Sequence, residues 1–94
     1  MHAYREWDAG KAAANLKKHD ISFEEATTVF LAPLAMTYPD PDHSAGERRE
    51  ITIGHTMEQK LVFVAHCERG SRIRVISARL ATKSEKKKYE EGIE

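Results

Sequence analysis

The sequence contains few features that would cross-link, anchor or export the chain. Its one cysteine, Cys67, excludes an intramolecular disulfide and a cysteine-based zinc site, and we expect a structural thiol there. No stretch approaches the roughly 18 consecutive apolar residues of a transmembrane helix, and the first residues lack the apolar core of a signal peptide. We therefore expect a cytoplasmic protein without membrane contact, whose fold depends on packing alone.

The chain also lacks net charge, although its charges are unevenly divided. Residues 1–68 hold 7 Lys and Arg against 11 Asp and Glu (net −4), whereas residues 69–94 hold 8 against 4 (net +4). Such a basic segment is typical of a surface that binds phosphates, and a solvated face or a frayed tail gives the same pattern. With 94 residues, 40% of them hydrophobic, the length fits one domain, residues 1–94.

Two helices are predicted in the first third of the sequence. Asp8 is a good N-cap for a helix over residues 11–18 that ends near His19 and Asp20. Ser22 opens the second helix, because Glu25 three residues later completes a capping box, and Pro33 ends it. The apolar stripes that should pack inward are Ala12, Ala13 and Leu16 on the first helix, and Phe23, Ala26, Phe30 and Leu31 on the second.

The rest of the sequence predicts a β-meander and a final helix. Alternating or continuous apolar residues indicate strands at residues 35–38, 51–53, 61–65 and 73–78, and short polar connections favour antiparallel pairing. Residues 4–7 form a candidate edge strand. Thr82 and Glu85 make a second capping box, which opens a charged helix carrying Tyr89. The predicted fold is α+β: two N-terminal helices on one face of a four-stranded antiparallel sheet, with the other face open for a partner or substrate.

Arginines on the last predicted strand are candidates for phosphate binding. Period-two alternation places Arg72 and Arg74 on the face opposite Ile73 and Val75. Arg79 would share that face only through a β-bulge or the end of the strand. Guanidinium groups bind phosphate bidentately and stabilise the extra negative charge of a pentacoordinate phosphorus.

Candidates for proton transfer lie at the end of the apolar strand and of the first helix. His66 is a candidate because the reference pKa of a histidine side chain lies near neutral pH, and Glu68 carries a carboxylate that can act as a base or orient an imidazole. A histidine in this position is more often a structural residue. Lys18 and His19 are further candidates, with charge capping of the helix as their alternative role. Tyr89 could stack on a base or anchor its helix to the sheet.

Metal and thiol chemistry are less favoured. Asp40, Asp42 and His43 have a spacing that a divalent metal could use, yet the sequence offers no recognisable further ligand beside them. Cys67 and His66 are adjacent on a strand, so their side chains point to opposite faces and cannot easily pair. We therefore expect no metal and no other cofactor.

Several segments, in order and over nearly the whole chain, resemble the BrnT family of bacterial type II toxins. They are Glu6-Trp7-Asp8, residues 15–19, residues 22–26, Glu68-Arg69-Gly70, residues 73–79, residues 81–83 and residues 85–90. One departure is Asp20, at a helix end where the family usually has glycine. The resemblance implies a RelE-like fold and a ribonuclease toxin that cleaves RNA without a metal. It also implies a BrnA-type antitoxin that neutralises the toxin, and repression of their promoter DNA by the complex.

Residue roles follow from the resemblance combined with the chemistry above. Arg74 and Arg79 would form the phosphate clamp, and His66 or Glu68 would transfer protons. The RNA-binding residues would be Arg69, Arg72, Lys83, Tyr89, Lys18 and His19. A second reading is a non-catalytic corepressor subunit that binds nucleic acid or antitoxin, and a third is a small assembly domain. In the toxin reading, the antitoxin covers the basic face, together with Trp7 and the open sheet face.

Overall fold

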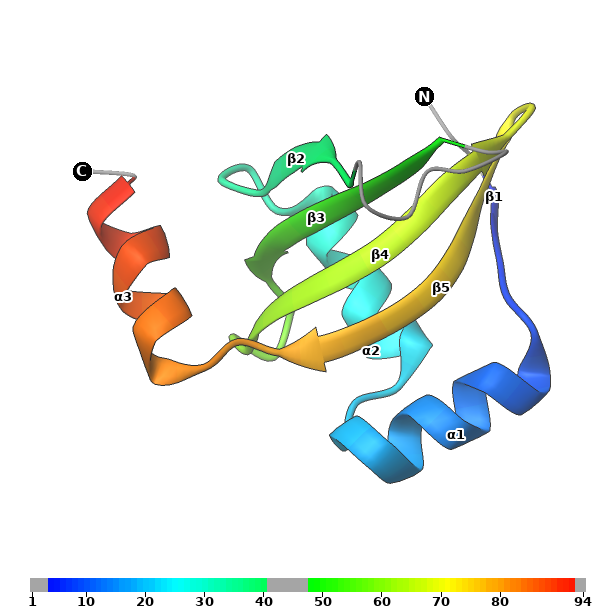
Figure 1. Cartoon of the computed structure of the whole chain (residues 1–94), viewed down its shortest axis with the longest axis horizontal. Coiled ribbons are helices and arrows are strands. Elements are labelled where there is room, and N and C mark those ends of the chain that lie inside the picture. Colours follow the sequence, from blue (N-terminus) through cyan, green and yellow to red (C-terminus); the bar gives the residue numbers. More distant parts are fainter. Residues whose placement is uncertain (1–3, 41–47, 93–94) are drawn as a thin grey trace.

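The computed structural model describes residues 4–40 and 48–92. Three α-helices and one 3-10 helix accompany five strands in this part of the chain (Figure 1). In chain order the elements are β1 (Tyr4–Glu6), α1 (Ala9–His19), α2 (Phe23–Ala26), the 3-10 helix η1 (Thr27–Leu31), β2 (Met36–Pro39), β3 (Arg49–His55), β4 (Leu61–Arg69), β5 (Arg72–Leu80) and α3 (Lys83–Gly92).

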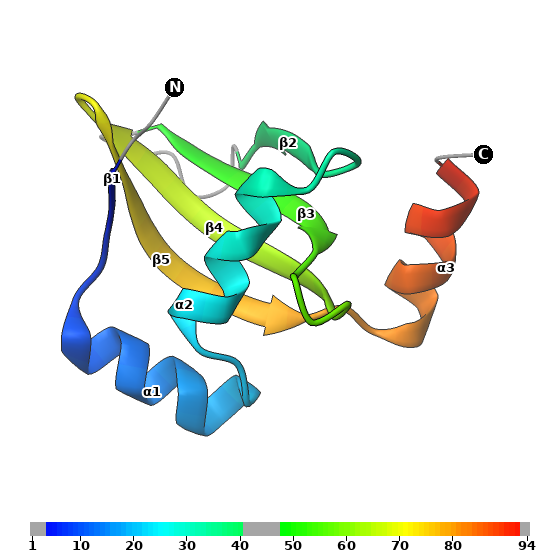
Figure 2. The ribbon, with the colours of Figure 1, turned by 180° about the vertical axis from the view of Figure 1, so that it is seen from behind.

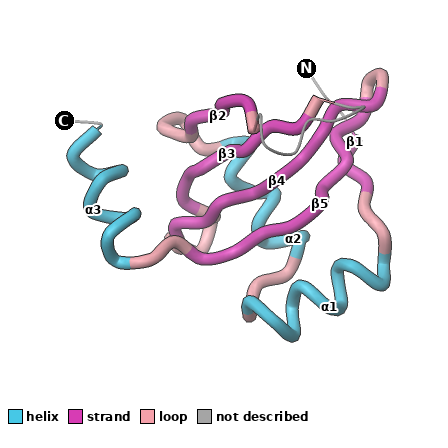
Figure 3. The backbone as a smooth tube through the Cα atoms, viewed as in Figure 1, coloured by secondary structure: helices cyan, strands magenta, loops and turns pink. Residues whose placement is uncertain are grey.

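The strands form one mixed sheet with the order β1-β5-β4-β3-β2 (Figure 3). The four strands β2 to β5 are antiparallel neighbours, as predicted. The expected four-stranded antiparallel sheet is wrong in one respect, because β1 adds a fifth strand parallel to β5, with Tyr4 opposite Arg72. A parallel pair needs a long connection, and the whole chain between β1 and β5 provides it.

The two N-terminal helices occupy different places beside the sheet. Figure 2 shows α2 in front of the strands and α1 along the outer side of β5. We expected both helices across one face, but α1 packs mainly against β5. The main core lies between α2 with η1 and the sheet and consists of Ile21, Phe23, Ala26, Val29, Val62, Val64, Val75 and Ala78. Trp7 packs edge-on against Phe23, with ring centroids 5.7 Å apart, so its ring contributes to this core.

The second predicted helix changes its winding halfway. It is α-helical only to Ala26 and continues as the 3-10 helix η1 to Leu31. A 3-10 helix has about three residues per turn, which shifts the phase of its inward face. Val29 is therefore fully buried, whereas Leu31, which the α-helical period placed inside, is 71% exposed.

The first helix begins and ends where the sequence predicted. The Asp8 side chain accepts a hydrogen bond from the Lys11 N–H, and Asp20 adopts a left-handed conformation with φ of 56°. Asp20 thus takes the backbone position that favours glycine, and its N–H donates to the Leu16 carbonyl. The predicted apolar stripe is confirmed only for Ala12, which packs against the core. Ala13 and Leu16 are exposed, and Asn15 is the buried residue of α1.

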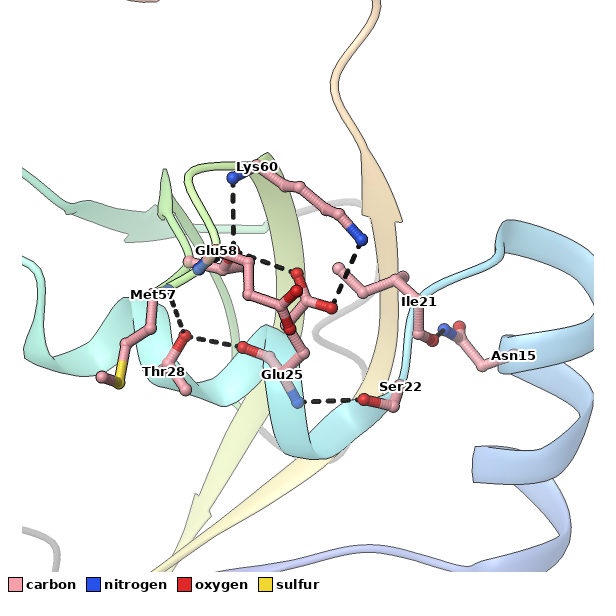
Figure 4. Close-up of polar contacts among 9 residues, drawn as sticks. Asn15, Ile21, Ser22, Glu25, Thr28, Met57, Glu58 and Lys60 are labelled. Carbon is pink, nitrogen blue, oxygen red and sulfur yellow. Dashed lines mark hydrogen bonds and ion pairs between the residues drawn. The ribbon is translucent and has the colours of Figure 1, made fainter.

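Glu25 connects α2 to the turn between β3 and β4. Figure 4 shows Ser22 accepting from the Glu25 N–H, which is one half of the predicted capping box. The Glu25 carboxylate does not complete that box; it accepts from Thr56 Oγ1 at 3.1 Å and lies 3.5 Å from Lys60 Nζ. The Thr28 hydroxyl accepts from the Met57 N–H beside it. These contacts fix the turn against the helical layer.

A β-bulge in β5 decides which side chains share a face of the sheet. The pairing of β4 with β5 shifts between Ala65 and His66, so that Ile76 is an extra residue on β5. Beyond the bulge Arg79 lies opposite Phe63, and before it Arg74 lies opposite Cys67. Because side chains alternate along β4 and opposed residues share a face, Arg74 and Arg79 both lie on the face away from α2. We call this the open face.

One end of the open face is covered by α3. Tyr89 is buried against Ile53 and Leu61, and its hydroxyl donates a 2.6 Å hydrogen bond to the Leu34 carbonyl. The predicted capping box of α3 is complete, because Thr82 and Glu85 each accept from the other's backbone N–H. The open face is therefore narrower than expected, and its accessible part lies toward Ala65 and Ser77.

Candidate functional site

A cleft on the open face brings together the end of α1, the start of β3 and the end of β5. Its volume is about 260 Å³. We call it the open-face cleft, and it is lined by His19, Asp40, Arg49, Ile51, Phe63, Ala65, Ser77, Ala78 and Arg79. A hydroxyl, an imidazole, one carboxylate and two guanidinium groups thus surround an apolar floor. The two guanidinium groups suit a phosphate, and the apolar floor suits its attached sugar or base.

His19 reaches the cleft because α1 is tied to the outer side of β5. The buried side chain of Asn15 accepts from the Ala78 N–H at 3.1 Å and donates to the Ile21 carbonyl at 3.2 Å. His19 lies four residues after Asn15, so both stand on the same side of the helix. The two hydrogen bonds therefore place the last turn of α1 beside Ser77 and Arg79.

Arg79 is held on three sides. Its Nη1 and Nη2 donate to the two carboxylate oxygens of Glu85 at 2.8 and 2.9 Å, and Nη1 also donates to the Leu80 carbonyl at 3.4 Å. The guanidinium lies over the Phe63 ring, with Cζ 4.4 Å from the centroid. Hydrogen bonding to Glu85 raises the pKa of Arg79 above its ordinary value, against the opposing effect of partial burial. The cation is thus permanent and oriented.

Glu85 is the carboxylate beside this cation. Hydrogen bonds from Arg79 and from the Thr82 backbone N–H lower the pKa of Glu85 from 4.5 to about 2. Glu85 is therefore ionised throughout the neutral range. The same carboxylate caps the first turn of α3, so the helix and the arginine are connected through one side chain.

Arg72 and Arg74 form a second basic group toward the other end of β5. The Arg74 and Arg72 Nη1 atoms lie 3.2 and 3.5 Å from the two carboxylate oxygens of Glu6 on β1. Five residues separate Arg74 from Arg79, which is roughly 15 Å along a strand. The two arginines of the predicted clamp therefore share a face but are fixed by different carboxylates at different places. Arg69 and Arg72 flank the exposed β4–β5 turn.

The predicted proton-transfer residues lie on the opposite face of the sheet. His66 and Glu68 line a separate pocket of about 290 Å³, the helix-side pocket, with Arg5, Phe30, Thr37, Glu50, Thr52 and Ile73. His66 is 3% exposed; its Nε2 is 2.7 Å from Thr52 Oγ1, and its ring packs edge-on against Phe30. The sheet separates these two residues from Arg74 and Arg79, so the predicted set does not meet in one site.

The other predicted RNA contacts differ in accessibility. Lys18 at the end of α1 and Lys83 at the start of α3 are exposed. Tyr89 is 4% exposed and burial raises its pKa, so it anchors α3 to the sheet and presents no face for stacking on a base. The anchoring role, which the sequence left as an alternative, is the one the structure shows.

Thiol and metal candidates are resolved where the structure describes them. Cys67 is fully buried as a free thiol. Asp40 lines the open-face cleft, whereas Asp42 and His43 lie outside the described residues. Over residues 4–40 and 48–92, His, Cys, Asp and Glu side chains do not form a group of three that could hold a metal ion.

Within the same ranges, none of the helices is long and apolar enough to cross a membrane.

Sequence reasoning missed Arg49 as a member of the cleft. The signal was present, because strand alternation places Arg49 on the same face as Ile51 and Ile53. That face could be recognised as the open one only after the register with β4 was known. Arg5 lines the helix-side pocket, with its Cζ 5.5 Å from the centroid of the Phe30 ring. It was missed because its face could be recognised only after the register of β1 with β5 was known.

Known proteins share this sequence pattern and this fold. A family model described as the ribonuclease toxin BrnT of a type II toxin–antitoxin system matches residues 7–85. The fold is similar to the 1.1 Å crystal structure of the Brucella abortus ribonuclease toxin BrnT, with a TM-score of 0.70 and 26% identity, covering 86% of this chain and 100% of that chain. No curated protein matches the sequence. Because the family match spans most of the chain and includes the α1, β4 and β5 residues that line the cleft, the chain belongs to the BrnT family of ribonuclease toxins of type II toxin–antitoxin systems.

Proposed function

We propose that the chain cleaves RNA in the open-face cleft. The observation that carries this proposal is that His19, Ser77 and Arg79, from two distant parts of the sequence, line one cleft of about 260 Å³. An imidazole supplies proton transfer near neutral pH, and a guanidinium supplies the positive charge that a phosphorane requires. The family membership supports a ribonuclease, and the cleft supports this location for it.

The proposed reaction uses the 2′-hydroxyl of the RNA as the nucleophile. His19 takes the proton from the 2′-oxygen, which then attacks the adjacent phosphorus. The bond from phosphorus to the 5′-oxygen breaks, and that oxygen takes a proton from water, leaving a 2′,3′-cyclic phosphate and a 5′-hydroxyl end. Arg79 stabilises the charge that accumulates on the non-bridging oxygens, and the apolar floor at Phe63 accepts a base or sugar.

Metal independence is part of the proposal. His19 and Arg79 together supply proton transfer and charge stabilisation, so the reaction as written needs no bound cation. Further cations on the same face and around it track the RNA backbone on either side of the cleft. They are the half-buried Arg74 and the exposed Arg69, Arg72, Lys18 and Lys83.

A BrnA-type antitoxin is the proposed partner. It would cover the open face and exclude RNA from Arg74 and Arg79 by steric and electrostatic shielding. Promoter DNA would be bound only through the toxin–antitoxin complex, and the protein would act in the cytoplasm. Exposed apolar side chains at the β2 side of the sheet, Leu34, Met36 and Tyr38, offer additional surface for such a partner.

Cleavage of a labelled single-stranded RNA in EDTA tests the proposal. The antitoxin-free protein should cleave the RNA, and Arg79→Ala and His19→Gln should each reduce the rate by about 100-fold or more. Glu68→Gln is the matched comparison, because Glu68 lies on the opposite face of the sheet. Loss of cleavage in Glu68→Gln, with full activity in His19→Gln, would move the site to the helix-side pocket.

A wild-type protein that binds this RNA without cleaving it would contradict the proposed reaction on free RNA. Expression of the wild type and of Arg79→Ala in growing cells then separates the remaining readings. Growth arrest by the wild type alone indicates cleavage that depends on the ribosome. If neither protein arrests growth, the result indicates a non-catalytic corepressor.

A further inference from the structure

We propose that Glu85 is a positioning residue for RNA cleavage, which holds the Arg79 guanidinium so that its remaining N–H edge is presented to a phosphate in the open-face cleft. This inference rests on the proposed function of that cleft. Glu85 belongs to α3 and contacts Arg79 from outside the cleft. It lines a neighbouring apolar hollow with Phe63 and Tyr89, whereas Arg79 lines the cleft itself.

The hydrogen bonds of Arg79 leave one edge available. A guanidinium has five N–H donors. Two bonds to Glu85 and one to the Leu80 carbonyl use both protons of Nη1 and one proton of Nη2. Among the acceptors of residues 4–40 and 48–92, none is paired with the Nε proton or the second Nη2 proton. These two protons form the side-on fork that binds two phosphate oxygens.

The carboxylate is itself fixed, which allows it to orient its partner. Glu85 Oε1 also accepts from the Thr82 N–H at 2.9 Å, and the Thr82 hydroxyl accepts from the Glu85 N–H at 3.1 Å. The Phe63 ring beneath the guanidinium restricts its rotation out of plane. The low pKa of Glu85 keeps this arrangement intact throughout the neutral range. Arg79 is thereby preorganised, and it needs little reorientation to meet the negative charge that develops on the phosphorane oxygens in the transition state.

An inhibitory role for Glu85 predicts the opposite behaviour. If the carboxylate occupied the edge that phosphate needs, RNA would have to displace it, and removing its charge would accelerate cleavage. The donor count argues against displacement, because a phosphate and Glu85 can bind Arg79 at the same time through different edges.

Glu85→Gln is the decisive variant, because glutamine is also compatible with a capping box. Its amide can accept from only one Nη atom, and its NH2 group faces the other, so the bidentate contact is lost while the helix cap is kept. Glu90→Gln is the matched control, since Glu90 is exposed on the same helix and forms none of the Arg79 contacts. We expect Glu85→Gln to lower kcat on single-stranded RNA roughly 10- to 100-fold, with KM changed by less than about twofold, and Glu90→Gln to match the wild type.

A double-mutant cycle with Arg79→Lys shows whether Glu85 acts through Arg79. In the Arg79→Lys protein, adding Glu85→Gln should cause little further loss, because the oriented fork is already absent. An equal loss in both backgrounds, unchanged kcat in Glu85→Gln, or faster cleavage would each overturn the positioning role. If instead the wild type cleaves RNA and Arg79→Ala cleaves it equally well, the proposed function of the cleft fails first, and this inference with it.

Discussion

Asn15 connects the fold to the proposed site, and its replacement by alanine is the most informative single change. Its side chain is 7% exposed and bonds two backbone groups that are distant in sequence, the Ala78 N–H on β5 and the Ile21 carbonyl after α1. Both partner residues are 1% exposed. Asn15→Ala removes both hydrogen bonds and leaves two buried backbone groups where water has little access.

The expected cost follows from these two groups. A buried donor or acceptor that loses its partner costs about 1–3 kcal/mol. Alanine recovers about 0.5 kcal/mol through its higher helix propensity. We therefore expect Asn15→Ala to lower the free energy of unfolding by about 1.5–5.5 kcal/mol, a large share of the roughly 5–14 kcal/mol typical of a domain this size. The melting temperature should fall by roughly 6 °C at the low end of this range and by several times that at the high end.

Urea denaturation followed by circular dichroism measures this change. The midpoint should fall with the m-value unchanged, because the surface exposed on unfolding stays the same. Lys11→Ala is the control on the same helix: its side chain is exposed, and the change should stay within about 0.5 kcal/mol. A loss below about 1 kcal/mol for Asn15→Ala would refute the reasoning, since it would mean that the two backbone groups find other partners or water.

Two further predictions concern packing and pH. In Gly54→Ala the new Cβ would lie 2.9 Å from the Cβ and 3.2 Å from the Cα of Ala35, so we expect a loss of about 1–3 kcal/mol in urea denaturation; Gly92→Ala, whose Cβ would meet no described atom within 4 Å, should not lose stability. The pKa of Glu85 falls from 4.5 to about 2 in the folded state, so its pair with Arg79 contributes stability above pH 4.5 that is lost as the pH falls toward 2. Melting temperatures measured over this interval should fall more steeply for the wild type than for Glu85→Gln, and parallel curves would contradict the assignment.

Local signals in the sequence predicted most of the elements. Asp8, Ser22 and Thr82 each cap the helix that the sequence assigned to them, and the four strands β2 to β5 lie where apolar alternation indicated. These features depend on neighbours a few residues away, which a linear sequence displays. Two errors have different causes. The parallel pairing of β1 with β5 joins segments at opposite ends of the chain, whereas Leu31 is exposed because a local 3-10 turn altered the helical phase.

The sequence predicted which types of residue form the candidate site, but not which of the candidate residues lie together in the fold. Arg79 was singled out on the condition that a β-bulge or the end of the strand brought it to the face of Arg74, and the register shift at Ala65 and His66 supplies the bulge. His66 and Glu68 follow the same alternation as Val64 and therefore lie on the helix side. The sequence showed that alternation as well, yet His19 became the stronger candidate only through the packing of α1 along β5.

The sequence by itself determined the helix caps, the order of the strands in the chain, the basic segment and the family, because each of these is encoded by nearby residues or by a recognisable succession of motifs. The tertiary structure decided which charged groups share a face. That outcome depends on one extra residue in β5, Ile76, and on the contact of Asn15 with Ala78, 63 positions away. A shift of one residue moves every side chain beyond it to the other face of the sheet, and long-range packing selects the register. The local sequence pattern therefore predicts neither the extra residue in β5 nor the contact between Asn15 and Ala78.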